Sequence, residues 1–256
     1  MSYFLYDGYL EVGKSACLSG EEAQHLLHAR RVKSGEFFEL QDLAKNHFLV
    51  VLERISRQKL FFKVEKQLSV LESSPLQLEL IVGLPKEKAL DWIIQKATEL
   101  GVTVLYFFMA RYTAKSIPAS RQEKALLRWQ KIAQAACKQS GRSLPPEIVL
   151  FNNLGQALES LASSPAQWVL TTEPGFYSSP ATLISEFASS KIQRFIVGPE
   201  GGLHAEELEL AYQHGMRSMS LGPRILRTET AAIAMIVILQ FLFGDLSQIK
   251  NIHSNI

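Results

Sequence analysis

The chain has 256 residues, of which 47% are hydrophobic and 20% are charged. This composition is typical of a globular protein and excludes a disordered, collagen-like or coiled-coil chain, and the length predicts one or two domains. The net charge is only +2, which taken as a whole does not indicate a nucleic-acid partner, because phosphate binding needs a concentrated positive face.

The first seventy residues predict a small antiparallel sheet or barrel. Short segments rich in Phe, Val and Leu at 36–41, 47–55 and 59–66 are typical of strands. A helix is expected after Ser19, because Ser19 and Glu22 have the spacing of a capping box. The serines and proline that follow indicate a linker, so we predict domains at 1–72 and 73–250.

After Pro75, apolar runs typical of strands alternate with segments whose apolar residues recur at helical spacing. A strand at 78–84 precedes a helix that Gly101 ends, and a strand at 102–109 precedes a helix at 121–140. Further strands are expected at 147–151, 167–172, 192–197 and 217–221, and further helices at 154–162, 181–188, 204–214 and 229–243. This alternation predicts an α/β fold with a parallel sheet.

Three features bear on location and chemistry. Cys17 and Cys137 are far apart and have no Cys or His neighbour at metal spacing, so we expect no disulfide framework, no metal and a reducing cytoplasm. Asp7 and Glu11 interrupt any export signal. The apolar stretch 231–243 is too short to span a membrane and is expected to be a buried helix.

Charge is distributed unevenly along the chain. Residues 86–142 hold 11 basic and four acidic side chains, a local balance of +7. Most of these cations lie on or beside the helix at 121–140, which is consistent with a phosphate-binding face. A solvated helix face is the structural alternative. The cations on or beside this helix are Lys115, Arg121, Lys124, Arg128, Lys131, Lys138 and Arg142.

Three loops that follow predicted strands are candidates for a ligand site, since ligands of open α/β sheets bind outside the carboxyl ends of strands. They cover 171–175, 198–202 and 221–231. The glycines of GPEGG (198–202) allow a ligand to approach the backbone. The absence of a lysine there disfavours a phosphate and leaves an adenosine-type ligand or an ordinary tight turn.

The third loop gathers Arg224, Arg227 and Glu229 before an apolar helix. Charged groups at the mouth of a buried helix need an ion-pair partner or a ligand, although Thr228 could simply cap the helix. At the end of the basic helix, Gly141 is an expected stop, whereas Arg142 has no such explanation.

Four of these stretches, QKATELG (95–101), WQKIAQAACKQSGR (129–142), VGPEGG (197–202) and LGPRILRTETA (221–231), resemble the ribosomal small-subunit methyltransferase E family. That family methylates N3 of a uridine in 16S rRNA with S-adenosylmethionine. Residues 22–40, with His25, Arg30, Arg31 and Gly35, also resemble its small domain, although the segment 28–32 departs from the expected apolar pattern.

The resemblance implies a PUA-like N-terminal β-barrel and a SPOUT α/β domain with a trefoil knot. It also implies a cytoplasmic homodimer that acts on 16S rRNA or the assembled small subunit, without a membrane or a metal. It assigns S-adenosylmethionine binding to Thr172, Gly198, Glu200, Gly201, Leu221, Gly222, Ile225, Leu226, Thr230 and Ala231. It assigns catalysis to Arg227, Glu229 and Arg142, and RNA binding to Arg30, Arg31, Lys115, Arg121, Arg128 and Lys138.

Methyl transfer to a uracil nitrogen is an in-line displacement that depends on orientation of the two reactants. A guanidinium, from Arg227 or Arg142, would stabilise the anionic ring, and Glu229 or Glu200 is a conceivable proton acceptor. An ion pair with a neighbouring arginine would weaken Glu229 as a base. The alternatives are a ribose 2′-O-methyltransferase of the same fold and a non-catalytic RNA-binding assembly factor.

Overall fold

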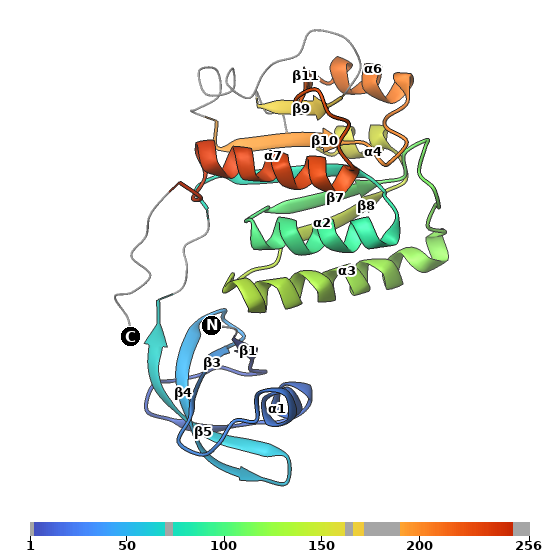
Figure 1. Ribbon diagram of the computed structural model, residues 1–256. Helices are drawn as coiled ribbons and strands as arrows, with labels where there is room; N and C mark the ends of the chain where they lie inside the picture. The colour runs from blue at the N-terminus through green and yellow to red at the C-terminus, as the bar shows by residue number, and fades with distance from the viewer. Residues whose placement is uncertain (1–2, 70–73, 162–165, 172–189, 248–256) are drawn as a thin grey trace. The chain divides into compact units, whose positions relative to one another are not determined.

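A computed structural model describes residues 3–69, 74–161, 166–171 and 190–247 (Figure 1). The chain forms two compact units. The first contains Met1–Glu72 and Cys137–Leu144, and the second contains Ser73–Ala136 and Pro145–Ile256. A boundary drawn only along the sequence therefore leaves out the segment 137–144 of the first unit. The helix expected at 181–188 and residues 71–73 of the expected linker lie outside the described residues.

The first unit is built on a five-stranded sheet in the order β1-β3-β4-β5-β2. The strands are β1 (Phe4–Leu5), β2 (Ser15–Leu18), β3 (Phe37–Gln41), β4 (His47–Ser56) and β5 (Lys59–Leu68). The last three confirm the predicted strands. β1 and β2 were not predicted, because two and four residues are too short to display an alternating pattern. Within the described residues no pairing joins β1 to β2, so a closed barrel stays a prediction.

The helix of this unit differs from the prediction. α1 (Glu21–His25) continues as a short π-helix, η1 (Leu26–Arg30), and Arg31 ends it in a left-handed conformation. The predicted capping box is wrong, because Gly20 with φ of 78° occupies the N-cap position and no side chain caps the helix. The Glu22 carboxylate instead pairs with Lys138, a residue distant in sequence.

The second unit contains a sheet of six strands, all of them paired in parallel, in the order β11-β9-β10-β6-β7-β8. They are β6 (Gln77–Gly83), β7 (Val104–Phe108), β8 (Glu147–Phe151), β9 (Gln167–Leu170), β10 (Ile192–Val197) and β11 (Arg217–Met219). The predicted parallel α/β sheet is confirmed. From β6 the next two strands are added on one side, whereas β9, β10 and β11 lie on the other side, so the direction of strand addition reverses between β6 and β10. The ends of β9, β10 and β11 therefore lie side by side.

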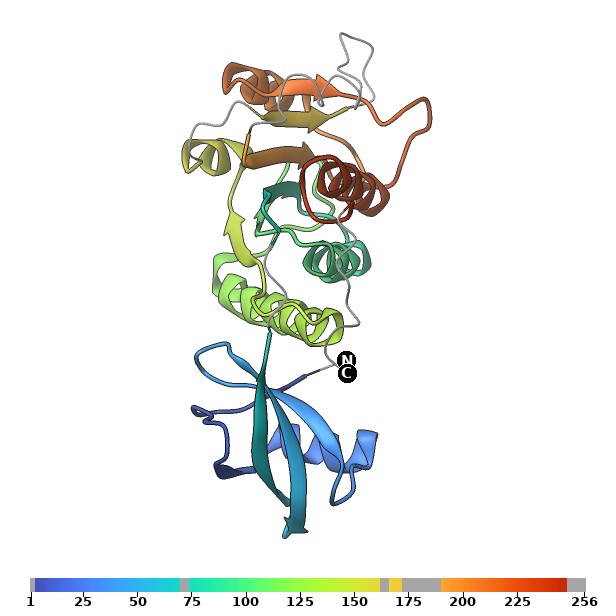
Figure 2. The same ribbon diagram turned by 90° about the vertical axis from the view of Figure 1, so that its left-hand side faces the viewer.

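Helices cover both faces of this sheet (Figure 2). α2 (Glu87–Glu99), α3 (Ala119–Ser140) and α7 (Thr228–Phe243) pack on one face, where Phe107 and Trp129 lie in the same core. α4 (Leu154–Glu159) and α6 (Ala205–Gln213) pack on the other face around Ile81 and Ile196. Two apolar layers therefore hold the strands rigidly and leave the loops at their ends to form a site.

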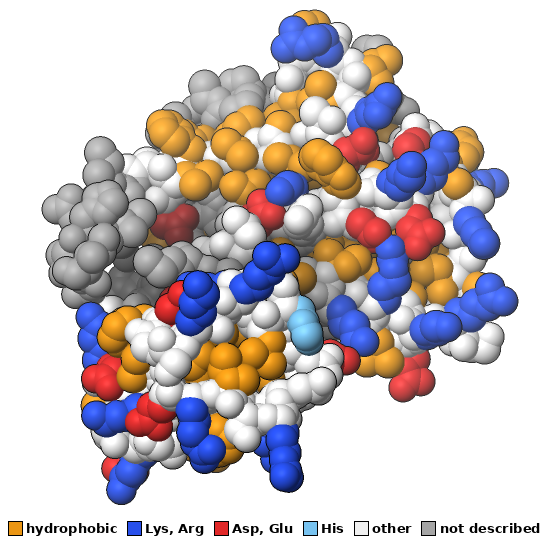
Figure 3. Space-filling view, turned by 60° about the horizontal axis from the view of Figure 1, so that its bottom comes forward, with side chains coloured by type: hydrophobic (Ala, Val, Ile, Leu, Met, Phe, Trp, Pro, Cys, Tyr) orange, Lys and Arg blue, Asp and Glu red, His pale blue; other side chains and the backbone are white. Residues whose placement is uncertain are grey.

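The apolar helix α7 packs one face into the core, as expected of a buried helix, but its other face is exposed. Met235, Ile236 and Leu239 are fully buried, whereas the exposed fractions of Val237 and Phe241 are 40% and 59%. Figure 3 shows hydrophobic side chains gathered over this helix. In the part of the chain that the structure describes, no helix is long and apolar enough to cross a membrane.

Candidate functional site

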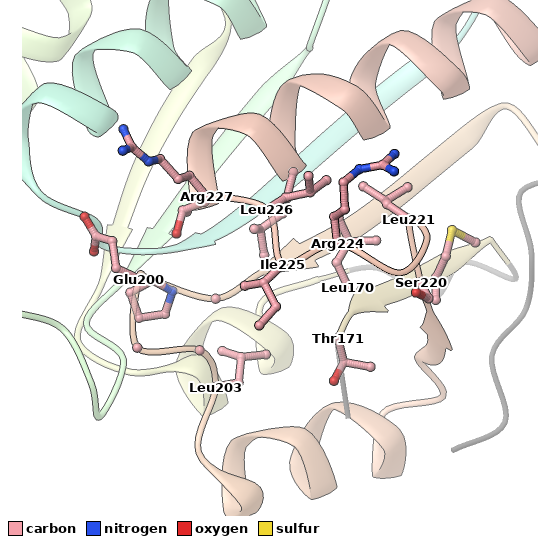
Figure 4. A pocket seen from close by; sticks show the side chains of 18 of the residues that line it. Leu170, Thr171, Glu200, Leu203, Ser220, Leu221, Arg224, Ile225, Leu226 and Arg227 are labelled. Atoms are coloured by element: carbon pink, nitrogen blue, oxygen red, sulfur yellow. The ribbon is translucent and has the colours of Figure 1, made fainter. Parts of the chain in front are cut away.

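The carboxyl ends of β9, β10 and β11 surround a cavity of about 490 Å³ (Figure 4). Parallel strands place these ends at one edge of the sheet, so loops distant in sequence meet there. Residues from the ends of the three strands and the two loops that follow β10 and β11 line the cavity, together with Leu208 of α6 and the start of α7. They are Leu170, Thr171, Val197, Gly198, Pro199, Glu200, Gly201, Gly202, Leu203, Leu208, Met219, Ser220, Leu221, Gly222, Arg224, Ile225, Leu226, Arg227, Thr228 and Ala231.

The loop 198–202 turns so tightly that side chains are excluded from it. A Cβ atom on Gly198 would lie 2.9 Å from the carbonyl carbon of Gly202 and 3.0 Å from the backbone nitrogen of Leu203. Gly202 has φ of 75°, a conformation that favours glycine. The GPEGG segment is therefore a backbone cradle at the end of β10.

Glu200 anchors this cradle to a neighbouring helix. The backbone N–H of Lys86, the N-cap residue of α2, donates to Glu200 Oε1 over 3.0 Å. A carboxylate at a helix N-terminus satisfies an otherwise unpaired backbone donor. This contact supports the loop-closing role of Glu200 rather than the role of a proton acceptor.

The loop 220–227 presents side chains to the cavity and to solvent. Its turn uses Gly222 with φ of 104°, and the exposed fraction of Ile225 is 87%. Within the described residues, the guanidinium groups of Arg224 and Arg227 have no ion-pair partner. In Figure 4 the Arg227 side chain points toward the side of the cavity that carries Glu200, and Arg224 points the other way.

The start of α7 corrects two sequence interpretations. Arg227 is the N-cap residue and no side chain caps the helix, so the capping role considered for Thr228 is wrong. Thr228 is instead buried in the first turn, beside the half-buried Glu229. No ion pair joins Glu229 to Arg227 or to another described residue.

Most of the residues predicted to bind the methyl donor are brought together at this cavity. The exceptions are Thr230, which is exposed on α7 and does not line it, and Thr172, which lies outside the described residues. Glu229 also does not line the cavity, whereas Arg227 does. Sequence reasoning missed the apolar floor formed by Leu170, Val197 and Met219, although each is the last residue of a strand.

The residues predicted to bind RNA fall into two groups. Arg30, Arg31, Lys115 and Arg121 are exposed. Arg128 is held by Asp91 at 2.5 Å and by Glu87 at 3.1 Å, and Lys138 pairs with Glu22, so these two cations are already neutralised. Arg142 is half-buried in the first unit, where its carbonyl accepts a hydrogen bond from Tyr3.

No described group of three His, Cys, Asp or Glu side chains could hold a metal ion.

Comparison with known families identifies the second unit. The RNA methyltransferase domain matches residues 72–240, which is more than half of the chain. The chain belongs to the RNA methyltransferase family. Among the members of known sequence, it is 28% identical to the ribosomal RNA small subunit methyltransferase E of Bacillus subtilis, over 88% of this chain and 89% of that protein. It is 29% identical to the enzyme of the same name from Buchnera aphidicola, over 92% and 91%.

Solved structures agree with this assignment. A Legionella pneumophila methyltransferase in complex with S-adenosylmethionine has a TM-score of 0.83 and 30% identity, over 95% of this chain and 98% of that chain. A ribosomal RNA small subunit methyltransferase E from Neisseria gonorrhoeae, bound to S-adenosylmethionine, has a TM-score of 0.83 and 29% identity, over 96% and 99%. The predicted resemblance to the methyltransferase E group is therefore confirmed for this RNA methyltransferase.

Proposed function

We propose that this RNA methyltransferase transfers a methyl group from S-adenosylmethionine to N3 of a uridine in 16S rRNA of the small ribosomal subunit. The observation that carries the proposal is the cavity at the ends of β9, β10 and β11, with a backbone cradle on one side and Arg227 at its edge. The names of its relatives support a small-subunit rRNA substrate.

The lining of the cavity fits S-adenosylmethionine. Leu170, Val197, Leu221 and neighbouring apolar side chains offer a surface for the adenosine moiety. Gly198, where a Cβ atom would contact Gly202 at 2.9 Å, keeps the cradle open to close approach of a ligand. The 198–202 cradle itself carries no lysine or arginine, as suits a donor without phosphates. When bound, S-adenosylmethionine supplies an activated methyl group on a positively charged sulfur.

Arg227 has the properties needed to act on the acceptor. The imide proton of uracil must leave N3, and a guanidinium near O2 or O4 stabilises the resulting negative charge. The Arg227 side chain is exposed and, among the described residues, has no acidic partner that would neutralise it. We assign Arg142 as a second cation for the uridine and Glu200 to loop geometry through its bond to Lys86.

RNA binding is assigned to both predicted domains. We propose that the domain at 1–72 is a PUA-like barrel that contacts RNA through Arg30 and Arg31. The exposed Lys115 and Arg121 would extend the cationic surface along α3, and Figure 3 shows Lys and Arg side chains over this helix. Arg128 and Lys138 have weaker support, because carboxylates pair with both.

The domain at 73–250 is proposed to carry a SPOUT trefoil knot and to dimerise. The exposed face of α7 includes Val237 and Phe241, and Trp92 of the adjacent α2 is 57% exposed. α7 has no charged side chain after Glu229, so its exposed face is apolar and suits an equally apolar face of a second copy. We propose the cytoplasm as the location, because the ribosomal substrate is there.

The proposed function is tested by incubating the protein, S-adenosylmethionine and small subunits from cells that lack it, followed by mass spectrometry of the RNA nucleosides. N3-methyluridine is the expected product. A 2′-O-methylated nucleoside would favour the ribose methyltransferase. RNA binding without methyl transfer to subunits or free rRNA would favour an assembly factor. If isothermal titration detects no binding of S-adenosylmethionine, the proposal is excluded.

A further inference from the structure

The loop between β7 and α3 carries an exposed aromatic ring that the reaction described above does not use. Tyr112 is 50% exposed. Single exposed apolar side chains are common on protein surfaces, so exposure alone does not indicate a ligand. The position of Tyr112 is more informative. The loop follows the carboxyl end of β7, and all strands of this sheet are parallel, so the loop lies at the same edge of the sheet as the cavity.

Tyr112 lies directly against the backbone cradle. A Cβ atom on Gly201 would lie 2.8 Å from Tyr112 Cβ and 3.4 Å from Tyr112 Cγ, so a side chain at this position would collide with the tyrosine. Gly201 lines the cavity, whereas Tyr112 does not. The tyrosine is therefore next to the cavity, on the outer side of the wall that Gly201 forms.

Contacts with the start of α6 hold the loop in place. The backbone N–H of Arg111 donates to Glu207 Oε1 over 3.0 Å, and the N–H of His204, the N-cap residue of α6, donates to Glu207 Oε2 over 2.8 Å. The Arg111 guanidinium also pairs with Glu206 over 2.8 Å. The Tyr112 and His204 rings meet at a centroid distance of 5.7 Å and an interplanar angle of 66°. These contacts fix the position of the ring relative to the cradle.

The same loop is basic. Residues 109–121 contain three basic side chains, Arg111, Lys115 and Arg121, and no acidic one. Lys115 and Arg121 are exposed and, among the described residues, have no ion-pair partner. An exposed aromatic ring beside free cations is typical of surfaces that bind single-stranded nucleic acid, because bases stack on the ring and the cations attract phosphates.

We propose that Tyr112 stacks on a base of the RNA substrate that flanks the methylated uridine, while Lys115 attracts the neighbouring phosphates. The inference rests on the proposed function. The flanking base is chosen because the reacting uridine must reach the methyl group inside the cavity, whereas Tyr112 lies outside it. If Tyr112 only packed against Gly201, its loss would change donor binding or stability without a specific effect on the RNA.

Two variants separate the ring from its packing role. Tyr112→Leu removes the aromatic face and keeps a Cβ atom against Gly201, and Tyr112→Phe removes only the hydroxyl. Tyr212→Leu is the matched control, because Tyr212 is a 40% exposed tyrosine of the same unit that lies about 10 Å along α6 from the first residue of that helix. It removes a ring of the same kind away from the cradle.

We expect Tyr112→Leu to raise KM for small subunits by about 5- to 100-fold, the effect of losing one stacked aromatic ring. Neither kcat nor the affinity for S-adenosylmethionine should change, since the lost contact is made equally before and during methyl transfer. Tyr112→Phe and Tyr212→Leu should both match the wild type. Lys115→Ala should raise KM less and reduce the slope of log KM against log salt concentration by about 1.

A second readout does not depend on turnover. Ultraviolet irradiation of the protein bound to small subunits, followed by mass spectrometry of the crosslinked peptides, should find a nucleotide attached to Tyr112. The adjacent nucleotide in the RNA should be the one that is methylated. A nucleotide attached to Tyr112 that is distant from the methylated uridine would overturn the inference.

The inference is also overturned if Tyr112→Leu has the KM of the wild type, or if Tyr112→Phe or Tyr212→Leu raises KM as much. A loss confined to S-adenosylmethionine affinity would show that Tyr112 only supports Gly201, and a loss confined to kcat would place the ring at the reacting uridine. Both results contradict the proposal. Failure of the wild type to methylate small subunits would reject the proposed function instead, and the crosslink would still test whether Tyr112 contacts RNA.

Discussion

The two loops that line the cavity differ in how they are held. The loop 198–202 is fixed by its own backbone, since Gly198 and Gly202 pack tightly and Glu200 accepts from the N–H of Lys86 over 3.0 Å. The loop 220–227 ends in exposed side chains, and Ile225 is 87% exposed. The loop 198–202 is held by contacts within the chain. The loop 220–227 carries Arg224 and Arg227, which have no ion-pair partner among the described residues.

This difference separates two tasks. A preformed backbone cradle binds a ligand without paying for reordering, which suits the methyl donor. An unpaired, solvated arginine can form its ion-stabilising contact only when an anionic group arrives, which suits an acceptor that becomes charged during the reaction. Substitution of Gly198 in the first loop should therefore change donor affinity, and substitution of Arg227 in the second should change turnover.

The largest effect is expected from Gly198→Val. The new side chain would collide with backbone atoms of Gly202 and Leu203 that lie within about 3 Å of a Cβ position. Overpacking of this kind costs about 1–3 kcal/mol of stability, and here it also fills the cradle. Titration calorimetry should detect no binding of S-adenosylmethionine, with Gly198→Ala intermediate. Wild-type affinity in a folded Gly198→Val protein would contradict the backbone-cradle interpretation.

Arg227→Ala should reduce methyl transfer by about 100- to 1,000-fold, the range observed when one donor that stabilises an anion is removed. Donor affinity should be retained, because no described contact of Arg227 holds the cradle. Arg224→Ala is the control, since Arg224 is also exposed and points away from Arg227 in Figure 4. Equal turnover in wild type and Arg227→Ala would exclude a catalytic role for Arg227.

Glu200→Ala should weaken donor binding by about fivefold, which corresponds to about 1 kcal/mol for a lost hydrogen bond to Lys86. Glu200→Gln keeps an oxygen acceptor for this N–H and should recover most of the affinity, with kcat unchanged. If Glu200 took the proton from uracil N3, the Gln variant would instead lose turnover while it retained affinity. Measuring both constants for both variants distinguishes the two roles.

The smallest effect is expected from Ile225→Ala. A side chain that is 87% exposed contributes little to packing, so the free energy of unfolding should change by less than about 0.5 kcal/mol. Donor affinity should fall slightly, because the side chain covers part of the cavity. A large loss of stability in thermal unfolding would show that the loop 220–227 is as firmly built as the loop 198–202.

Much of the fold and site could be predicted because local patterns encode it. The burial of Leu90, Ile93, Ile94 and Ala97 follows from their helical spacing, and Gly101 stops α2 where expected. The GPEGG and LGPRILRTETA motifs identified both lining loops from their position after strands. The capping box predicted at Ser19 is wrong, because a serine side chain caps a helix only from the N-cap position. Gly20, one residue later, occupies that position.

The sequence by itself determined the parallel α/β class, the approximate element boundaries and the loops that carry the site, because periodicity and turn residues act over a few neighbours. Only the tertiary structure decided which charges are free. The sequence predicts a charged side chain at both Arg128 and Arg227 and does not show which one has a partner. In the structure Asp91 lies 2.5 Å from Arg128 and neutralises it, whereas no described carboxylate pairs with Arg227. The Gln41–Ser143 contact spans 102 positions. Electrostatic and hydrogen-bond partners depend on distance in space, which packing sets and local patterns do not record.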